Sequence, residues 1–274
     1  MSSTTEPSAA AREAVARLLE TQGGKIYALG RRLCGNDTEA EELVQDTFLE
    51  ALRSYDAFRG GSKESTWLYT IAARACQRRR KRRATRAGVG PTPDVPLEQL
   101  APFDEPGIVA LDPAGAAEDH ELQDRLRDAI VDLPDEFRYA VVLRDIAGLS
   151  GPDAAAVLGV EPGTIKSRTH RARLMLRKAM LHGVPRRPAS EPNYDARVCL
   201  DLLAAKLHAL DRDAQEDART AALIRQGELC DRCRDVFATL DTTRQLCEHL
   251  GEGEMPEAVR TKIETILASH AAGR

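Results

Sequence analysis

Apolar residues recur every three or four positions along nearly the whole chain, which is the spacing of one face of an α-helix. Residues 38–54 show this spacing most clearly. Their predicted buried stripe is Ala40, Leu43, Val44, Thr47, Phe48, Ala51 and Leu52. Asn36 or Asp37 is a suitable N-cap for this helix. The helix dipole favours the acidic residues that the sequence has in the first turn. The pattern therefore predicts a helix with one face buried in a core.

Other segments of the first 86 residues have the same character. Residues 11–33 are predicted to form a helix pair that breaks near Gly23. Residues 65–83 are predicted to form one helix, with Trp67 in the core beside Leu68 and Ile71. The sequence has no strand-rich stretch, so the predicted fold class is all-α.

Two segments rich in proline interrupt the helical pattern. They are residues 87–118 and 183–193, which we interpret as linkers, the first of them flexible and acidic. The helical parts that they separate are 12–86, 119–182 and 194–274. The sequence therefore predicts two helical domains and a small helical C-terminal domain.

The composition narrows the class of protein. Apolar residues make up 42% of the 274 positions, which is enough to form cores. No stretch approaches the roughly 20 apolar residues of a membrane span, and Met1–Ala11 lacks the apolar region of a secretory signal. We therefore expect a cytoplasmic protein without a membrane partner, in which the six cysteines are reduced.

The charges are segregated along the chain. The net charge of −4 would by itself argue against a nucleic-acid partner. However, residues 74–86 contain eight basic residues and no acid, and residues 164–178 contain six basic residues and no acid. Acidic residues predominate between these two segments and again from Glu191 onward. The pattern predicts two basic surfaces for a polyanion.

The second basic segment lies in a predicted helix-turn-helix. A short helix is expected over 153–158, Gly159 provides the sharp turn, and the next helix begins at residues 162–164. In this motif the N-terminal part of the second helix enters the major groove of DNA. Ile165, Thr169, Ala172 and Leu176 are predicted to face inward.

The sequence resembles a known family in both helical domains. The segments 132–138, 148–150, 163–168 and 171–173 resemble region 4 of the extracytoplasmic-function sigma factors. The segments 40–48, 58–60 and 65–72 resemble region 2 of the same family, in the family's order. The resemblance implies a factor that directs core RNA polymerase to promoter DNA, with no catalytic residue of its own.

The resemblance also implies which residues make each contact. Polymerase would bind Glu41, Gln45 and Asp46. The −10 promoter element would bind Arg59, Lys63, Ser65, Thr66, Arg74, Arg78 and Arg79. The −35 element would bind Thr164, Lys166, Ser167, Arg168, His170, Arg171 and Arg173.

The C-terminal part contains four of the six cysteines, and several interpretations are open. Cys199, Cys230, Cys233 and Cys247 are candidate ligands for zinc or another soft metal, with His208 or His249 as an alternative fourth ligand. The spacing resembles a zinc-binding anti-sigma domain, except that Gln226 stands where that family has a ligand histidine. A looser resemblance is to sigma factors with metal-sensing, cysteine-rich tails.

A thiol redox switch and ordinary buried cysteines are the other interpretations of this part. Cys34 and Cys76 are predicted to be core residues. We expect the extension to regulate the promoter-binding domains, and an anti-sigma factor is a further expected partner. The alternative functions are a helix-turn-helix regulator that does not bind polymerase and, more remotely, a thiol oxidoreductase.

Overall fold

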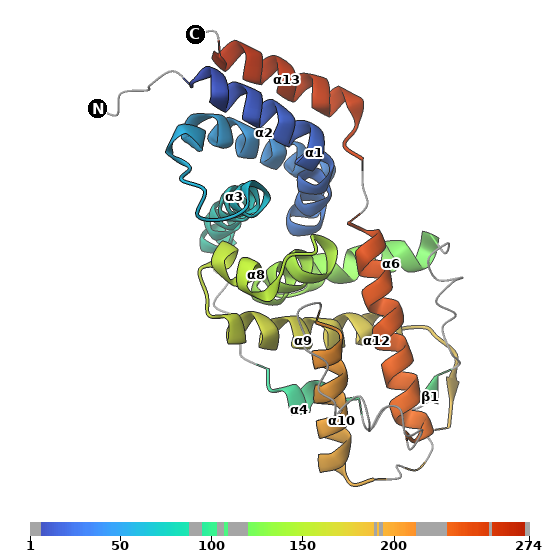
Figure 1. Cartoon of the computed structure of the whole chain (residues 1–274). Coiled ribbons are helices and arrows are strands. Elements are labelled where there is room, and N and C mark those ends of the chain that lie inside the picture. The colour runs from blue at the N-terminus through green and yellow to red at the C-terminus, as the bar shows by residue number, and fades with distance from the viewer. Residues whose placement is uncertain are drawn as a thin grey trace. The chain divides into compact units, whose positions relative to one another are not determined.

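The structure is a computed structural model that describes residues 7–87, 95–102, 107–108, 120–188, 191, 194–211, 229–251 and 254–271. The chain divides into two compact units (Figure 1). The first is drawn from residues 1–91, 152–161 and 250–274, and the second from 92–151 and 162–249. The division shows that the chain crosses between the units more than once.

The first unit is a bundle of long helices. Its helices are α1 (Ala9–Cys34), α2 (Asp37–Ser54), α3 (Glu64–Ala87) and α13 (Glu257–Ala271), with a short 3-10 turn η1 (Tyr55–Ala57) after α2. The α1, α2 and α3 helices pack on one another, and α13 lies along α1 and α2 (Figure 1). The predicted stripe of α2, from Ala40 to Leu52, is buried as expected.

Local sequence explains how α2 begins. The side chain of Asn36 accepts a hydrogen bond of 2.8 Å from the backbone N–H of Glu39, which satisfies one of the free donors of the first turn. Gly35 ends α1 with a φ of 88°, a left-handed conformation that favours glycine. Both signals lie within a few residues of the helix ends that they determine.

The predicted break near Gly23 is wrong, because α1 is continuous from Ala9 to Cys34. A Cβ atom at Gly23 would come within 3.0 Å of the end of the Met255 side chain, and one at Gly30 within 3.1 Å of the Cα atom of Ala40. These glycines therefore allow close packing on α1. Such contacts compensate for the cost of about 1 kcal/mol that glycine imposes inside a helix.

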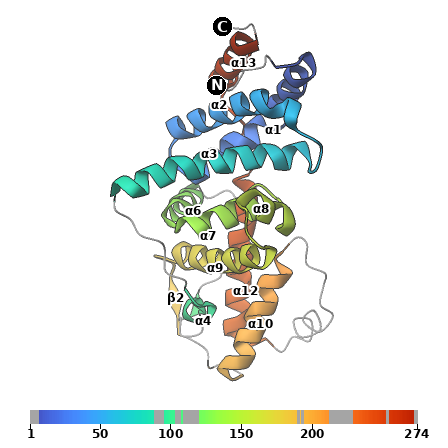
Figure 2. The same ribbon diagram turned by 90° about the vertical axis from the view of Figure 1, so that its left-hand side faces the viewer.

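The second unit is built around α9. It contains α4 (Leu97–Leu100), α6 (His120–Asp132), α7 (Asp135–Val141), a π-helical turn η2 (Val142–Ile146), α9 (Pro162–Met180), α10 (Ala196–Ala209) and α12 (Asp231–His249). The α6, α7 and α12 helices all pack on α9, and α10 packs on α12 (Figures 1 and 2). The all-α prediction is confirmed. The described residues contain one exception, a two-residue antiparallel pairing of β1 (Gly107–Ile108) with β2 (Arg186–Arg187).

The helix-turn-helix has the expected local form. The α8 helix (Gly151–Leu158) ends just before Gly159, whose φ of 67° makes the turn that leads into α9. The C-terminal part is helical as predicted, but it is divided, since α10 and α12 belong to the second unit and α13 to the first. Among the described residues, no helix combines the length and apolar character needed to span a membrane.

Candidate nucleic-acid interface

The predicted polymerase-binding residues lie on α2, off its buried stripe. Glu41 and Gln45 are half-buried, and Asp46 is exposed. The Arg79 guanidinium of α3 pairs with Asp46 and also donates a hydrogen bond of 2.8 Å to the Glu42 carboxylate. This acidic face of α2 is therefore linked to the basic end of α3.

The predicted −10 residues differ in accessibility. Four of them are exposed, namely Arg59, Lys63, Arg74 and Arg78. Ser65 is half-buried, and Thr66 is buried with an exposed fraction of 5%. Arg74 and Arg78 are four positions apart on α3 and so share one face. Among the −10 residues, the accessible basic charge thus lies on the loop before α3 and on one side of that helix.

The prediction that Trp67 lies in the core is wrong. Trp67 is half-buried and belongs to an aromatic cluster with Tyr55 and Phe58. The ring centroids of Phe58 and Trp67 are 5.0 Å apart, and those of Tyr55 and Trp67 are 5.8 Å apart. Aromatic residues make up only 4% of the chain, so the closeness of Phe58 and Trp67 in the sequence is a signal that could have indicated this cluster. The cluster gives the loop before α3 a surface on which a base can stack.

Glu64 fixes the start of α3 beside this cluster. Its carboxylate accepts a hydrogen bond from the Tyr55 hydroxyl and pairs with Arg17 of α1 at 3.0 Å. The hydrogen bond from Tyr55, together with the Arg17 contact, lowers the pKa of Glu64. Glu64 therefore stays ionised near neutral pH and ties the first turn of α3 to α1.

The predicted −35 residues lie along α9 and fall into two groups. Lys166 is exposed, and the half-buried members of the set are Thr164, Ser167, Arg168 and Arg171. Arg168 pairs with Glu136 of α7 at 2.8 Å. His170 and Arg173 are buried. In this conformation the N-terminal half of α9 is accessible to DNA, whereas His170 and Arg173 are not.

Arg173 is held in a buried network. Its Nε and Nη2 atoms donate hydrogen bonds of 2.8 and 2.7 Å to the two carboxylate oxygens of Asp145 in η2. Its Nη1 atom donates a hydrogen bond of 2.8 Å to Asp211, directly beyond α10, and His170 Nε2 lies 3.0 Å from the same carboxylate. Burial lowers the pKa of Arg173, but the contacts with Asp145 and Asp211 outweigh it and raise the pKa overall.

Three of the four candidate metal-ligand cysteines share one buried cluster. Cys199, Cys230 and Cys233 lie in the core formed by α10, α12 and Leu174 of α9. Burial, with contributions from Cys230 and Cys199, raises the pKa of the Cys233 thiol to about 12.

The predicted fourth ligands lie elsewhere. Cys247 and His249 follow Cys233 on the continuous helix α12 by 14 and 16 residues, which is more than ~20 Å at a rise of ~1.5 Å per residue. His208 lies about 14 Å along α10 from Cys199 by the same measure.

The four cysteines therefore do not come together as one four-cysteine group. Within the described ranges, no group of three or more His, Cys, Asp or Glu side chains is placed to hold a metal ion. Gln226 lies outside the described residues. Because α12 is one continuous helix, Cys247 and His249 do not join Cys233 in one group here, and metal binding by the cysteine cluster stays a prediction.

The other cysteines form a pair in the first unit. The Sγ atoms of Cys34 and Cys76 are 3.5 Å apart, where α1 meets α3. Their mutual contact and burial raise the pKa of the Cys34 thiol. Cys76 is fully buried and Cys34 half-buried, so Cys76 is a core residue as predicted and Cys34 lies at the edge of the core.

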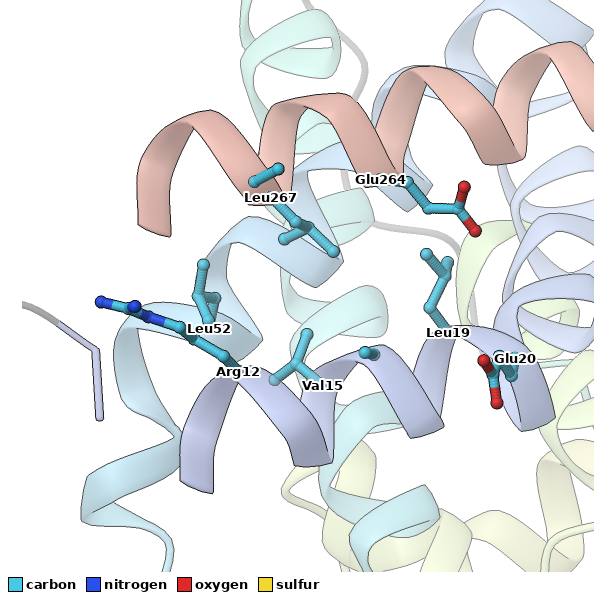
Figure 3. Close-up of a pocket in the computed structure, with 9 residues that line it drawn as sticks. Arg12, Val15, Leu19, Glu20, Leu52, Glu264 and Leu267 are labelled. Carbon is cyan, nitrogen blue, oxygen red and sulfur yellow. The ribbon is translucent and has the colours of Figure 1, made fainter. Parts of the chain in front are cut away.

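A pocket of about 260 Å³ lies between α13 and the α1–α2 pair (Figure 3). Most of its wall is apolar, with Val15 and Leu19 from α1, Leu52 from α2 and Leu267 from α13. Its charged residues, such as Glu20 and Glu264, are at the edge in Figure 3. None of the predicted polymerase- or DNA-binding residues lines it.

Comparison with known proteins shows which family regions contain the two basic segments. Residues 18–86 match the model of sigma-70 region 2, and residues 123–176 match that of sigma-70 region 4. The ECF RNA polymerase sigma factor SigW of Bacillus subtilis is 34% identical over 176 residues, covering 61% of this chain and 89% of SigW. The chain belongs to the extracytoplasmic-function (ECF) sigma factors.

Two other sigma factors are also similar to this chain. SigE of Mycolicibacterium smegmatis is 37% identical over 162 residues, covering 58% of this chain, and the chain spans 59% of the length of SigE. The sigma factor RpoE of Bartonella quintana, solved in complex with the anti-sigma factor NepR, is 28% identical over 62% of this chain and 97% of RpoE, with a TM-score of 0.46.

Membership of the family has two consequences. Sigma factors are transcription initiation factors and not enzymes, so the absence of a predicted catalytic residue agrees with the family. The match to region 2 also decides against the alternative of a helix-turn-helix regulator that does not bind polymerase. Both matched regions end before α10, and the role of the C-terminal extension is not given by them.

Proposed function

We propose that this ECF sigma factor binds core RNA polymerase through α2 and directs it to promoters in the cytoplasm. The supporting observation is the face of α2 around Asp46, which stays accessible while Leu43, Val44 and Phe48 are fully buried. An exposed acidic helix face can bind a basic surface with little rearrangement of its own core.

The −10 element would bind the loop before α3 and the exposed face of α3. Arg59, Lys63, Arg74 and Arg78 would neutralise phosphates. Phe58 and Trp67 would stack on a base that leaves the duplex. Every base has a face that can stack on an aromatic ring, and this stacking compensates for the free energy lost when the base pair opens.

The −35 element would bind the N-terminal half of α9 in the major groove. Lys166, Ser167 and Arg168 would contact base edges and phosphates, with Arg171 on the adjacent backbone. Arg173 would support α9 through Asp145 instead of contacting bases.

The C-terminal extension would regulate this helix by covering part of it. Leu174 of α9 shares its core with Leu203 and Leu207 of α10 and Phe237 of α12. This role is the one that the resemblance to an anti-sigma domain implies, here supplied by the same chain. The three cysteines are buried, and burial raises the pKa of the Cys199 and Cys233 thiols, which supports the interpretation of core residues over that of a redox sensor.

Reconstitution tests the proposed function. The full chain is combined with core RNA polymerase, and the complex is assayed for transcription from genomic fragments selected by the complex itself. Lys166→Gln should reduce transcription without reducing polymerase binding, and Asp46→Ala should reduce both. The proposal would be contradicted if the chain bound the same fragments without polymerase and gave no transcription when polymerase was added.

A further inference from the structure

One stripe of α9 carries four basic residues. Lys166, His170, Arg173 and Arg177 follow one another at intervals of four, three and four positions, and residues with this spacing share a helix face. Lys166 is exposed, whereas the other three are buried, with exposed fractions of 9% or less. The basic face is therefore open at its N-terminal turn and covered farther along.

The cover consists of residues from the C-terminal extension. Arg177 Nε donates a hydrogen bond of 2.8 Å to the Thr239 hydroxyl on α12. Asp211, which follows α10, places its carboxylate between two members of the stripe, 3.0 Å from His170 Nε2 and 2.8 Å from Arg173 Nη1. Asp211 thus contacts the stripe at its centre.

The Arg173 guanidinium is divided between two carboxylates with different roles. Its Nε and Nη2 atoms bind Asp145, which belongs to region 4 together with α9. Its Nη1 atom binds Asp211 and the backbone oxygen of Leu207, both in the extension. If the extension moved away, Arg173 Nη1 and His170 Nε2 would lose their partners together.

Asp211 is charged in this position. Burial raises the pKa of its carboxyl, but the contacts with His170 and Arg173 outweigh burial and hold the pKa at about 2. Near neutral pH, Asp211 is an anionic oxygen acceptor for an arginine and a histidine on a DNA-binding helix. A phosphate oxygen of the DNA backbone meets the same two requirements, charge and acceptor geometry.

We propose that Asp211 occupies, on α9, the position of a DNA backbone phosphate, so that the extension and duplex DNA bind this stripe in competition. This inference rests on the proposed function of α9 in DNA binding. The group that competes with DNA is then the Asp211 carboxylate, directly after α10.

The test compares two substitutions that remove the same charge from the full chain. Asp211→Asn removes the negative charge that faces the stripe and keeps the size of the side chain. Asp241→Asn is the matched control, because Asp241 is on α12 in the same unit and pairs with Lys206 of α10 at 2.7 Å. Binding to a fluorescein-labelled duplex of mixed sequence is measured by anisotropy at low ionic strength.

We expect Asp211→Asn to bind the duplex roughly tenfold more tightly than Asp241→Asn, since a charge-assisted contact no longer opposes DNA. Amide hydrogen exchange should also increase in residues 170–177 of Asp211→Asn alone. Equal affinity of the two variants, with equal exchange in α9, would overturn the inference. Far-ultraviolet circular dichroism shows whether both variants keep their helices.

A third substitution separates this inference from the proposed function. Lys166→Gln, at the open end of the stripe, should weaken duplex binding in both backgrounds. If it does so while Asp211→Asn and Asp241→Asn bind equally, α9 binds DNA and the competition by Asp211 is disproved. If Lys166→Gln changes nothing in either background, the role of α9 in DNA binding fails, and the inference fails with it.

Discussion

Arg79 of α3 forms an ion pair with Asp46 of α2. The first residue belongs to the basic segment that we assign to promoter DNA, and the second to the surface that we assign to polymerase. Burial lowers the pKa of Arg79, but the contacts with Asp46 and Glu42 outweigh it and raise the pKa, so this guanidinium stays charged. Polymerase that engages Asp46 would therefore compete with Arg79 for the carboxylate.

This relationship gives a direct prediction for Asp46→Ala. The variant should lose at least roughly tenfold in affinity for core polymerase, because an anchoring acid at an interface commonly contributes that much. Pull-down of purified core polymerase measures the loss. Asp37→Ala is the control, because it also removes one exposed acid from α2, where Asp37 pairs with Arg31. Equal retention of polymerase by the two variants would disprove the assignment of Asp46.

The aromatic cluster beside α3 predicts a defect in strand opening. Trp67→Ala should reduce formation of the open promoter complex by roughly tenfold or more, since a stacked base contributes about 1–3 kcal/mol. Permanganate reactivity of unpaired thymines in the polymerase complex measures opening. Trp67→Phe keeps an aromatic ring beside Phe58 and should retain most of the signal. Normal opening by Trp67→Ala would contradict a stacking role.

The core between α10, α12 and α9 predicts a large cost for losing one leucine. Leu203→Ala should lower the free energy of unfolding by about 2–5 kcal/mol, because Leu203 is 1% exposed in this core. Val198→Ala, at a position on α10 that is 39% exposed, should change it by less than about 0.5 kcal/mol. Urea unfolding measures both. Similar costs for the two variants would show that α10 does not pack as described.

The raised pKa of Cys233 predicts slow thiol chemistry. With a pKa of about 12, the thiolate fraction at pH 9 is only about 0.1%, and it increases about tenfold for each pH unit below the pKa. Iodoacetamide labelling followed by mass spectrometry should modify Cys233 far more slowly in the native chain than in urea. Duplex binding should also be unchanged by the disulfide-forming oxidant diamide. A large diamide effect that Cys233→Ser abolishes would favour a redox switch instead.

The contact of His170 with Asp211 predicts a dependence on pH. Burial lowers the pKa of His170 below its usual 6.5, although Asp211 opposes this change, and Arg173 and Lys166 contribute in the same direction as burial. Arg144 and His208 also face Asp211, each at 3.9 Å. A histidine with a lowered pKa is stabilised in the neutral form.

The covered state of α9 should therefore lose stability as the pH falls below about 6.5. Exchange in residues 170–177 should increase between pH 7.5 and pH 5.5 after correction for the intrinsic exchange rate. His170→Gln should remove most of this increase. If exchange in residues 170–177 were slower at pH 5.5 than at pH 7.5, the predicted direction of the pH effect would be wrong.

Local signals determined much of the fold before any packing was known. The α2 stripe, the Asn36 cap and the turn at Gly159 each depend on residues a few positions apart, so the sequence predicted them correctly. The predicted helix break at Gly23 was wrong, because this glycine leaves space for the side chain of Met255, which lies more than 200 positions later in the chain. Trp67 was misplaced for a related reason, since helical spacing identifies a face but not how deeply that face is covered.

The sequence by itself determined that the chain is helical, that its basic residues form two blocks, and that these blocks belong to regions 2 and 4 of a sigma factor. Only the tertiary structure decided that His170 and Arg173 are covered, and that Cys199, Cys230 and Cys233 lie apart from Cys247. Helix periodicity and capping act over a few residues. The contact between His170 and Asp211 spans 41 positions and depends on how α10 and α12 bury their apolar faces against α9.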